Sequence, residues 1–377
     1  MTLDHIVVAG GSIAAVTAAG ALRTAGFGGR VTLVSAERAA PYSRVPLSKG
    51  VMIGTETPES AALPALPDDV ELMLGTAAAG LRVDRRELIL AGGGVVDYDG
   101  LVIATGARAR RLAAPGQRGE LVVRTLADAE AIAERRADAS SAVVVGGGFL
   151  GMEVASTLRH HGLEVTVVDM EPPLRRLLGP WLAEYVTKAA LEHGVRLVIS
   201  EGGVVLEGDP ISGVRLGNGE FIAGDLVVSA VGDIPNAEWL EGSGLRLANG
   251  VVVDERCRVA PAITGAGDVV SREVSPGVFR RTPHWSNAVA QGRAAATSLL
   301  DDGASPYVPD HYFWTEQYGL DVKIAGEPPL VGEPDVLAGD LDGREVLLRW
   351  SNTDDATTAV VSINYRMPAA RLRKMVA

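Results

Sequence analysis

A glycine-rich turn between two apolar runs, at residues 142–169, limits what this chain can fold into more than any other stretch. It consists in order of an apolar run, a G-x-G-x-x-G turn, a helical pattern, a second apolar run and an acid: Ala142–Val145, Gly146 with Gly148 and Gly151, Glu153 to about His160, Val165–Val168, and Asp169. The acid follows the first glycine by 23 residues. The pattern predicts a strand, a tight turn, a helix and a second, parallel strand.

Each part of this unit has a physical role in holding a dinucleotide. The first glycine lets the chain turn sharply out of the strand, the second lets a pyrophosphate approach the backbone, and the third lets helix and strand pack closely. The helix N-terminus offers free N–H groups and a partial positive charge to the phosphates. The acid, Asp169, accepts hydrogen bonds from an adenosine ribose. The stretch therefore predicts a dinucleotide-binding site.

Composition sets outer limits on the protein. The 377 residues are 47% hydrophobic and 22% charged, which is ordinary for a globular chain of two or three domains. The net charge of −12 argues against nucleic acid as a partner, because phosphate binding needs a basic face. The single cysteine, Cys257, excludes an internal disulfide, a redox pair and a cysteine-ligated cluster. We interpret it as a small packing residue of a strand.

Two further classes are not expected. The apolar N-terminal stretch Ile6–Ala21 lacks the basic start of a signal peptide, because Asp4 precedes it. No uninterrupted apolar run approaches about 18 residues, so we expect no membrane span and a cytoplasmic protein. We expect no metal site, because His160 and His161 form a surface pair without further ligands.

Residues 3–37 repeat the same plan less strictly. A strand over Leu3–Ala9 leads into Gly10, and a helix, a second strand and an acid follow: Val16 to about Ala25, Val31–Val34 and Glu37. Ser12 and Ala15 stand where the second and third glycines are expected. Both residues are small, so the turn is still predicted to hold a dinucleotide.

The rest of the chain alternates strands and helices. We expect two small antiparallel inserts, over Val70–Leu74, Ala77–Asp84, Glu87–Leu90 and Val95–Tyr98, and over Val195–Ile199, Val204–Glu207, Ser212–Leu216 and Glu220–Ala223. Helices are predicted over Asp128–Ala139, Leu182–His193 and Ala288–Leu300. Beyond residue 304, alternating runs at Val346–Trp350 and Ala359–Asn364 indicate an antiparallel sheet, followed by a basic helix over Pro368–Met375.

Several segments together resemble a known family. They are the first glycine turn, PYSRVPLSK at 41–49, IATGA at 103–107, GGGFLGME at 146–153, GDIPNAEWL at 232–240, ITGAGDVV at 263–270, HWSNAVAQGRAAA at 284–296 and HYFWTEQYGL at 311–320. The set resembles the FAD-dependent NAD(P)H:ferredoxin reductases of the putidaredoxin-reductase type, which feed bacterial cytochromes P450 and ring-hydroxylating oxygenases. Val45, where the family often has proline, and Pro283, where an acid is expected, depart from it.

The resemblance implies roles for individual residues. Gly10, Ser12, Glu37 and Asp268 would bind FAD; Arg44, Lys49 and Trp285 would lie near its ring system, with Trp314 facing the flavin; and Gly146, Gly148, Gly151, Glu153, Asp169 and Gly232 would hold the nicotinamide nucleotide. The same segments add Ala14, Thr105, Gly106, Leu150 and Gly267 to the cofactor-binding set, and make Lys49, Trp285 and Trp314 the catalytic candidates. Hydride transfer to flavin needs close stacking and no acid–base triad.

The implied fold is α/β, with two Rossmann-like domains of the glutathione-reductase type and a C-terminal α+β domain. Its implied boundaries are 1–107 with 229–303 for tightly but non-covalently bound FAD, 108–228 for the nicotinamide nucleotide, and 304–377 for the C-terminal domain. The implied reaction passes electrons from NADH through flavin to a ferredoxin that supplies an oxygenase. A reductase of quinones or other small molecules, and a nucleotide-sensing protein with bound FAD, remain alternatives.

Two finer expectations concern the partners. Asp169 would accept from a ribose 2′-OH and repel a 2′-phosphate, which favours NADH over NADPH, although Arg175 and Arg176 follow soon after it. An acidic ferredoxin would be repelled on average by a chain of charge −12, so docking would need a local basic patch. The candidates are Arg280, Arg281, Arg366, Arg371, Arg373 and Lys374.

Overall fold

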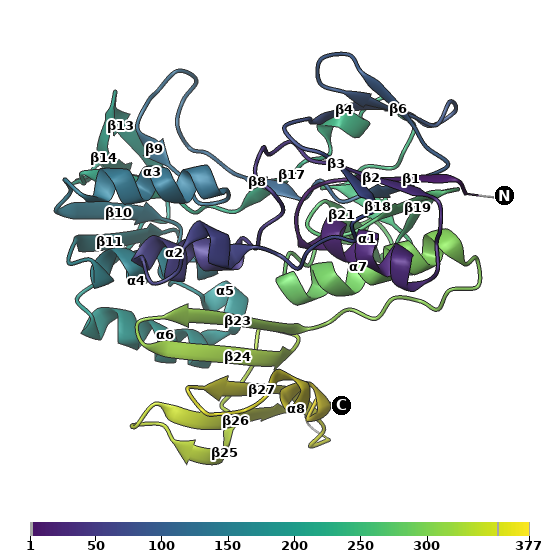
Figure 1. Cartoon of the computed structure of the whole chain (residues 1–377). Coiled ribbons are helices and arrows are strands. Elements are labelled where there is room, and N and C mark those ends of the chain that lie inside the picture. Colours follow the sequence, from purple (N-terminus) through teal and green to yellow (C-terminus); the bar gives the residue numbers. More distant parts are fainter. Residues whose placement is uncertain (1–2, 353, 377) are drawn as a thin grey trace. The chain divides into compact units, whose positions relative to one another are not determined.

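The computed structural model describes residues 3–352 and 354–376, and the chain forms two compact units (Figure 1). Each unit is assembled from three stretches of chain. The first contains the chain up to Ser43, Ala61–Arg108 and Ile234–Asp310; the second contains Arg44–Ser60, Ala109–Asp233 and the chain from His311 onward. The chain passes between them five times, after Ser43, Ser60, Arg108, Asp233 and Asp310; two of these crossings lie within short strands, β8 (Ala107–Ala109) and β17 (Asp233–Pro235).

The first unit is built on a six-stranded sheet. Its strand order is β19-β20-β7-β1-β2-β3, namely Arg258–Ala260, Ile263–Gly265, Gly100–Ile103, His5–Ala9, Arg30–Val34 and Val70–Met73. All neighbouring pairs are parallel except β19–β20. Successive residues of β1 point to opposite faces, so Ile6 and Val8 enter one buried cluster and Val7 and Ala9 another. The sheet is therefore covered on both sides.

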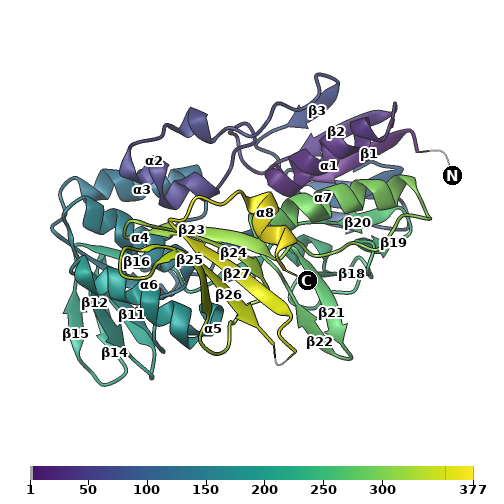
Figure 2. The ribbon, with the colours of Figure 1, turned by 90° about the horizontal axis from the view of Figure 1, so that it is seen from below.

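Different elements cover the two faces of this sheet. Helices α1 (Ile13–Thr24) and α7 (Trp285–Leu300) lie side by side on one face (Figure 2). Two small sheets share the core of the other face, β4-β5-β6 and β18-β21-β22: Ala78–Arg82, Glu87–Leu90 and Val95–Asp97; Val251–Val253, Val270–Ser275 and Val278–Arg280. The 3-10 turn η3 (Glu238–Leu240) also belongs to this unit, whereas η2 (Pro58–Ala61) crosses the boundary between the units after Ser60.

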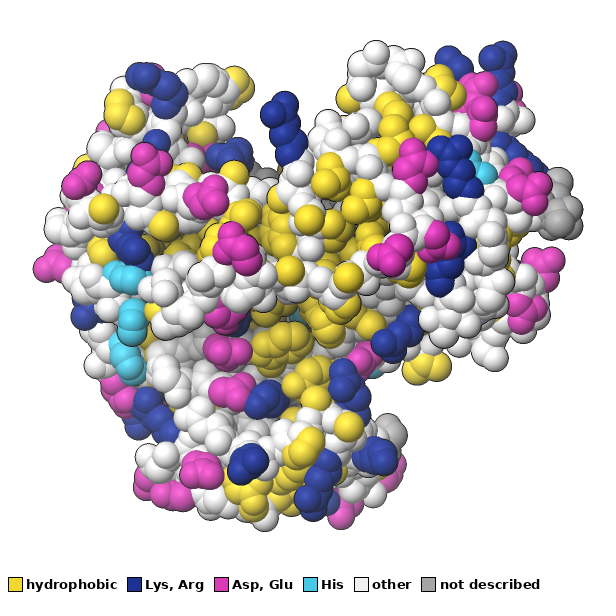
Figure 3. Space-filling view, in the orientation of Figure 1, with side chains coloured by type: hydrophobic (Ala, Val, Ile, Leu, Met, Phe, Trp, Pro, Cys, Tyr) yellow, Lys and Arg dark blue, Asp and Glu magenta, His cyan; other side chains and the backbone are white. Residues whose placement is uncertain are grey.

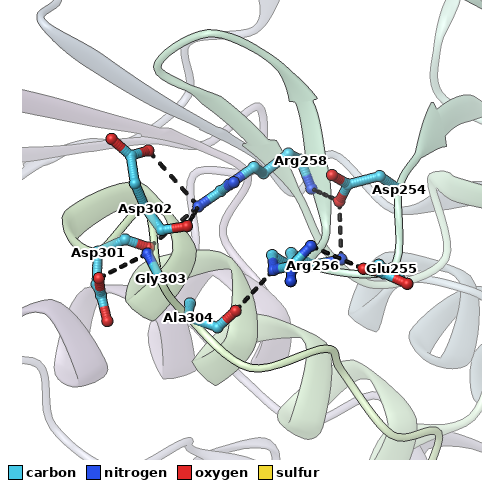
Figure 4. A network of polar contacts seen from close by, with 8 residues as sticks. All are labelled: Asp254, Glu255, Arg256, Arg258, Asp301, Asp302, Gly303 and Ala304. Carbon is cyan, nitrogen blue, oxygen red and sulfur yellow. Dashed lines mark hydrogen bonds and ion pairs between the residues drawn. The ribbon is translucent and has the colours of Figure 1, made fainter.

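Two arginines tie the loop after α7 to the turn between β18 and β19 (Figure 4). Arg256 Nε donates to Ala304 O at 2.7 Å, and one Arg258 Nη donates to Asp302 O at 2.9 Å.

Cys257, between these two arginines in the sequence, is fully buried, and its backbone φ is +61°. It lies in the bend before β19 and not, as the sequence had predicted, in a strand, because its left-handed backbone conformation belongs to the turn. Burial raises the pKa of its thiol to about 12, so this cysteine is unreactive at neutral pH.

The second unit repeats this plan around a parallel five-stranded sheet. The order is β12-β11-β10-β16-β9, namely Arg196–Ile199, Glu164–Asp169, Ser141–Val145, Leu226–Ser229 and Glu120–Leu121. A small antiparallel sheet, β13-β14-β15, shares a buried cluster with Val143 and Val145 of β10: Val204–Gly208, Ile211–Leu216 and Phe221–Ala223. Before residue 311 the helices of the unit are α2 (Gly50–Ile53), α3 (Leu126–Arg136), α4 (Phe149–His160), α5 (Arg175–Leu178) and α6 (Pro180–Glu192), with the 3-10 turn η1 (Val45–Ser48).

An antiparallel sheet with one helix ends the second unit. Its order is β23-β24-β27-β26-β25, with α8 packed on it: Tyr312–Gln317, Leu320–Gly326, Thr357–Ile363, Glu345–Ser351, Asp335–Asp340 and Ala369–Lys374. This confirms the expected C-terminal sheet and basic helix. The Trp181 ring of α6 stacks on Tyr185 at 5.6 Å and meets Trp350 of β26 edge-on at 5.9 Å. These aromatic contacts explain why the C-terminal segment groups with the second unit.

The structure contradicts two of the strand predictions, and it groups one segment with the other unit. Val70–Met73 and Arg196–Ile199 are parallel edge strands beside β2 and β11, and they do not belong to the antiparallel inserts. Alternation of apolar residues predicts a strand but not its neighbour, which explains both errors. Residues 44–60, expected with the FAD-binding segments, group instead with the second unit, because Thr157 Oγ1 donates to Ser48 O at 2.8 Å.

Within residues 3–352 and 354–376, no helix is long and apolar enough to cross a membrane.

Candidate dinucleotide-binding sites

The three glycines after β10 meet three different requirements. Gly146 has φ +106°, and a Cβ there would lie 2.4 Å from the carbonyl oxygen of Ala230. A Cβ on Gly151 would lie 1.9 Å from Gly146 O, so helix and turn can approach only without it. Gly148 is different, because it has φ −75° and a Cβ would meet nothing closer than Leu177 Cδ1 at 3.7 Å. The protein itself therefore needs glycine at 146 and 151 but not at 148.

The N-terminus of α4 is open toward a ligand. Gly148 is its N-cap residue, no side chain caps it, and its first turn carries no acid. Helix α3 in the same unit is capped instead, because Thr125 and Asp128 form a reciprocal capping box. The first-turn N–H groups of α4 and its positive end are thus available to an anion. This arrangement fits the pyrophosphate of a dinucleotide.

Asp169 lies at the end of β11 beside this turn. Its Oδ2 accepts a hydrogen bond from Gly147 N at 2.6 Å, and its Oδ1 accepts one from Met170 N at 2.6 Å. Each carboxylate oxygen can accept a further bond, so the acid is oriented by the backbone and still able to bind a ribose hydroxyl. Met170 follows with 60% of its surface exposed and provides an apolar surface beside the acid.

The first unit has the same turn built from a different sequence. Gly10 has φ +140°, and a Cβ there would lie 2.1 Å from Ala104 O. The first glycine of each turn donates its N–H to the next strand at 2.8 Å, Gly10 to Val34 O and Gly146 to Val168 O. Ser12 is the N-cap residue of α1, and its side chain forms no cap, so this helix N-terminus is open as well. Ala15, at the third position, is fully buried in the core cluster that covers this face of the sheet.

The position equivalent to Asp169 is a serine that the sequence reasoning missed. Val34 pairs with Ala9 as Val168 pairs with Val145, so Ser35 corresponds to Asp169. Glu37, the predicted acid, lies two residues further, where its carboxylate accepts a hydrogen bond from the Tyr42 hydroxyl at 2.5 Å. A Cβ on Gly11 would lie 2.2 Å from Ser35 Oγ, which parallels the contact of Gly147 with Asp169. Strand register, not spacing along the chain, identifies this residue.

Other predicted residues of the first unit are joined by hydrogen bonds. Thr105 Oγ1 donates to Asn236 O at 2.7 Å, and Asn236 N donates to Gly106 O at 2.9 Å, so the IATGA and GDIPN segments interlock. Gly267 N donates to the buried Gln291 Oε1 of α7 at 2.9 Å. A Cβ on Gly267 would approach Ala14 Cβ to 3.0 Å. These contacts bring the ITGAGD turn to the beginning of α1.

A buried cluster in the second unit surrounds Glu153, on the second turn of α4. Its Oε2 accepts from Ser48 Oγ at 2.6 Å and from Lys49 Nζ at 2.7 Å, and its Oε1 accepts from Thr315 Oγ1 at 2.7 Å. The Lys49 and Glu153 side chains are 13% and 7% exposed, so this is a largely desolvated ion pair. Contact of Glu153 with the nicotinamide nucleotide stays a prediction, whereas its contacts inside the protein are with Ser48, Lys49 and Thr315. Ser48 and Thr315 had no signal of their own in the sequence.

The predicted site residues divide between the two units. Gly10, Ser12, Ala14, Glu37, Thr105, Gly106, Gly267, Asp268 and Trp285 lie in the first; Arg44, Lys49, Gly146, Gly148, Leu150, Gly151, Glu153, Asp169, Gly232 and Trp314 lie in the second. Trp285 begins α7 and is 38% exposed. Trp314 lies in β23 with its ring centroid 6.0 Å from that of Tyr312. Arg44 donates to Arg124 O at 3.1 Å.

Comparison with known proteins identifies the family. The model of the pyridine nucleotide-disulphide oxidoreductases matches residues 4–292. The chain belongs to this family. It is 37% identical over 333 residues to rhodocoxin reductase of Rhodococcus erythropolis, covering 85% of this chain and 78% of that protein. It is 33% identical over 370 residues to the ferredoxin reductase component of chlorobenzene dioxygenase from Cupriavidus sp. (strain PS12), covering 96% and 89%.

Solved structures agree with this assignment. The ferredoxin reductase for the CYP199A2 system of Rhodopseudomonas palustris superposes with a TM-score of 0.87 at 32% identity, over 96% of this chain and 91% of that one. Putidaredoxin reductase in its covalent complex with putidaredoxin gives 0.85 at 30% identity, over 96% and 90%. The chain is an oxidoreductase with the expected α/β fold, and its family supports FAD and NAD(H) as cofactors. With one cysteine, it cannot use the redox cysteine pair that the family name suggests.

Proposed function

We propose that this chain is an NADH-dependent ferredoxin reductase. It passes electrons from NADH through bound FAD to a ferredoxin-type iron–sulfur protein, which supplies a cytochrome P450 or another oxygenase. The observation that carries the proposal is the pair of open helix N-termini behind matched glycine turns, at Ser12 and Gly148. The relatives at 30–37% identity named above, three of them ferredoxin or rhodocoxin reductases, support the acceptor class.

We assign FAD to the first turn and the nicotinamide nucleotide to the second. In this proposal FAD is bound by residues 1–107 and 229–303 and NADH by residues 108–228, with residues 304–377 forming a C-terminal domain. FAD, when bound, accepts a hydride from nicotinamide and releases electrons to one-electron acceptors. The chain's own part is to bind and orient. The α1 N-terminus would hold phosphate, and Lys49, for which the family resemblance implies a place near the flavin ring, would favour the electron-rich ring.

The choice of NADH rests on the charges at the end of β11. Asp169 accepts hydrogen bonds from two backbone N–H groups, which fix the orientation of its carboxylate. Arg175 and Arg176 could receive a 2′-phosphate, but Arg176 is paired with an acid, because its Nε lies 3.4 Å from Glu171 Oε1. A 2′-phosphate bound here would therefore lie near the carboxylates of Asp169 and Glu171, which would repel it. A higher kcat/KM with NADPH than with NADH would contradict this reasoning.

Two basic groups are proposed to dock the acidic iron–sulfur protein: Arg280 with Arg281, and Arg366, Arg371, Arg373 and Lys374. On the face shown in Figure 3, dark-blue cations gather over the C-terminal sheet and α8 while acidic and basic groups are interspersed elsewhere. Arg373 is fixed there, because its guanidinium carbon lies 4.2 Å from the Tyr312 ring centre. Charge reversal at these positions should slow ferredoxin reduction, most at low salt. Unchanged rates would remove the residues from the docking surface.

The decisive experiment follows electrons in two steps. The purified protein should be yellow and should bleach anaerobically with NADH, and it should then reduce a ferredoxin faster than a quinone. A yellow protein that does not bleach would favour a nucleotide-sensing role. Bleaching with turnover only on quinones would favour a small-molecule reductase.

A further inference from the structure

The segment that follows β11 folds back over the glycine turn of the second unit. Leu174, in the left-handed region at φ +62°, donates its N–H to Gly147 O at 2.9 Å. A Cβ on Gly147 would lie 2.8 Å from Pro173 Cβ, so the proline ring packs directly on the turn. Leu177 Cδ1 lies 3.7 Å from a Cβ placed on Gly148. The segment therefore borders the place where the pyrophosphate is proposed to approach the backbone.

Helix α5, which this segment contains, is a single turn of four residues. A helix so short is not stable alone, so its position depends on the contacts at its two ends. Its first end is held by the bond from Leu174 to Gly147. At its other end, the fully buried Leu178 accepts a hydrogen bond at its carbonyl oxygen from Leu330 N at 3.1 Å. Leu330 lies in the loop between β24 and β25, so α5 connects the glycine turn to the C-terminal sheet (Figure 1).

Gly179, between α5 and α6, makes the contact with this loop possible. It has φ +87°, and a Cβ there would lie 1.9 Å from Leu330 O and 2.9 Å from Leu330 N. Only a residue without a side chain lets the two backbones approach so closely. The loop is itself fixed from the sheet, because Trp350 Nε1 of β26 donates to Gly332 O at 3.1 Å and the Trp350 side chain is buried. The C-terminal sheet thus holds the loop, and the loop holds the end of α5.

We infer that Gly179 and Leu330 are positioning residues for the nicotinamide nucleotide, because their contact fixes α5 over the glycine turn. The inference rests on the proposed function, which places that nucleotide at this turn. If α5 shifts, Leu177 moves relative to the turn, and the Gly147 peptide, whose N–H donates to Asp169 Oδ2, changes its orientation. The phosphate side and the ribose side of the site then both fit the nucleotide less well. A loop of the C-terminal sheet therefore controls NADH affinity through α5.

The test compares Gly179→Ala with Gly162→Ala as a matched control. Gly162 follows α4 with the same φ of +87°, but no heavy atom lies within 4 Å of a Cβ placed on it. Both alanines bear the same backbone strain, and only the one at 179 displaces Leu330. Gly179→Ala should raise the Kd of NADH by about fivefold to tenfold, within the range of couplings between distant sites. Gly162→Ala should keep the wild-type Kd.

Anaerobic rapid mixing against NADH concentration measures the Kd and the limiting rate of flavin reduction separately. In Gly179→Ala the limiting rate and the FAD content should stay at the wild-type values, because the change affects binding and not the reacting atoms. A purely structural defect would instead lower the amount of folded protein, and hence the amplitude, without changing the Kd.

The outcomes separate this inference from the proposed function. Failure of the wild-type protein to bleach with NADH would overturn the proposed function itself. If it bleaches, a wild-type Kd in Gly179→Ala, or an equal rise in Gly162→Ala, refutes the positioning role. If Gly179→Ala does not fold, Trp350→Phe decides, because it keeps an aromatic ring and removes the N–H that holds Gly332 O. A raised Kd is expected there, and a wild-type Kd would equally refute the inference.

Discussion

Replacement of Gly148 by alanine should weaken NADH binding while leaving the fold intact. The residue has ordinary backbone angles, φ −75° and ψ −176°, and a Cβ would find its nearest neighbour 3.7 Å away. The stability cost is small, because the entropy that alanine removes from the unfolded chain, about 0.4–1 kcal/mol, offsets its weakness as an N-cap. A methyl group between the backbone and a pyrophosphate displaces the ligand from the α4 N–H groups. Loss of one charged hydrogen bond, about 1.5–3 kcal/mol, raises the Kd roughly tenfold to a hundredfold.

Anaerobic rapid-mixing measurement of flavin reduction against NADH concentration gives this Kd, and thermal unfolding gives the stability. Gly151→Ala is the informative contrast, because its Cβ would overlap Gly146 O at 1.9 Å; overpacking should cost about 1–3 kcal/mol and lower the Tm. Gly20→Ala, in α1 with nothing within 4 Å of its Cβ, controls for the substitution and should raise stability by about 0.5–1 kcal/mol. Wild-type NADH affinity in Gly148→Ala would refute the proposed approach of the pyrophosphate to this residue.

Two further predictions concern stability. Glu153→Gln leaves Lys49 without its carboxylate and should lower the free energy of unfolding by about 3–5 kcal/mol in urea titrations, whereas the double variant with Lys49→Met should recover part of the loss; additive losses would show that the pair is not coupled. Asp225 accepts four hydrogen bonds from Ser140 and Ser141, which lower its pKa from 3.8 to about 2. Its contribution is complete above pH 3.8 and is lost as pH falls through about 2, so the Tm difference between wild type and Asp225→Asn should shrink over that window; a difference independent of pH would contradict it.

The sequence was sufficient for features that depend on local spacing. The α4 turn was predicted because Gly146, Gly148, Gly151 and Asp169 are ordered along 24 residues of chain, and the structure places them at one strand–helix junction. The helices and most strands followed from the periodicity of buried residues. These features are recorded within a single stretch of sequence and need no knowledge of distant partners.

Features that depend on distant contacts were not predictable. Ser35 was missed because only the register of β1 with β2 makes it the counterpart of Asp169. Thr315 lies 162 residues from Glu153, and no spacing rule joins a strand threonine to a helix carboxylate across that separation. The edge strand at Val70–Met73 has the composition of an insert strand, and only its parallel pairing with β2 assigns it to the main sheet.

The two turns also explain why an imperfect glycine pattern folds like a perfect one. The first glycine is required in both because the carbonyl of the neighbouring strand, Ala104 O or Ala230 O, occupies the place of its side chain. The third is required in the second turn, where a Cβ on Gly151 would overlap Gly146 O, whereas the first turn holds a fully buried Ala15 at this position. At the second position the protein leaves room for a Cβ on Gly148, so we expect Ser12 to affect the approach of a dinucleotide and not the turn itself. The three positions are therefore three separate constraints, and only the first belongs to the fold in both copies.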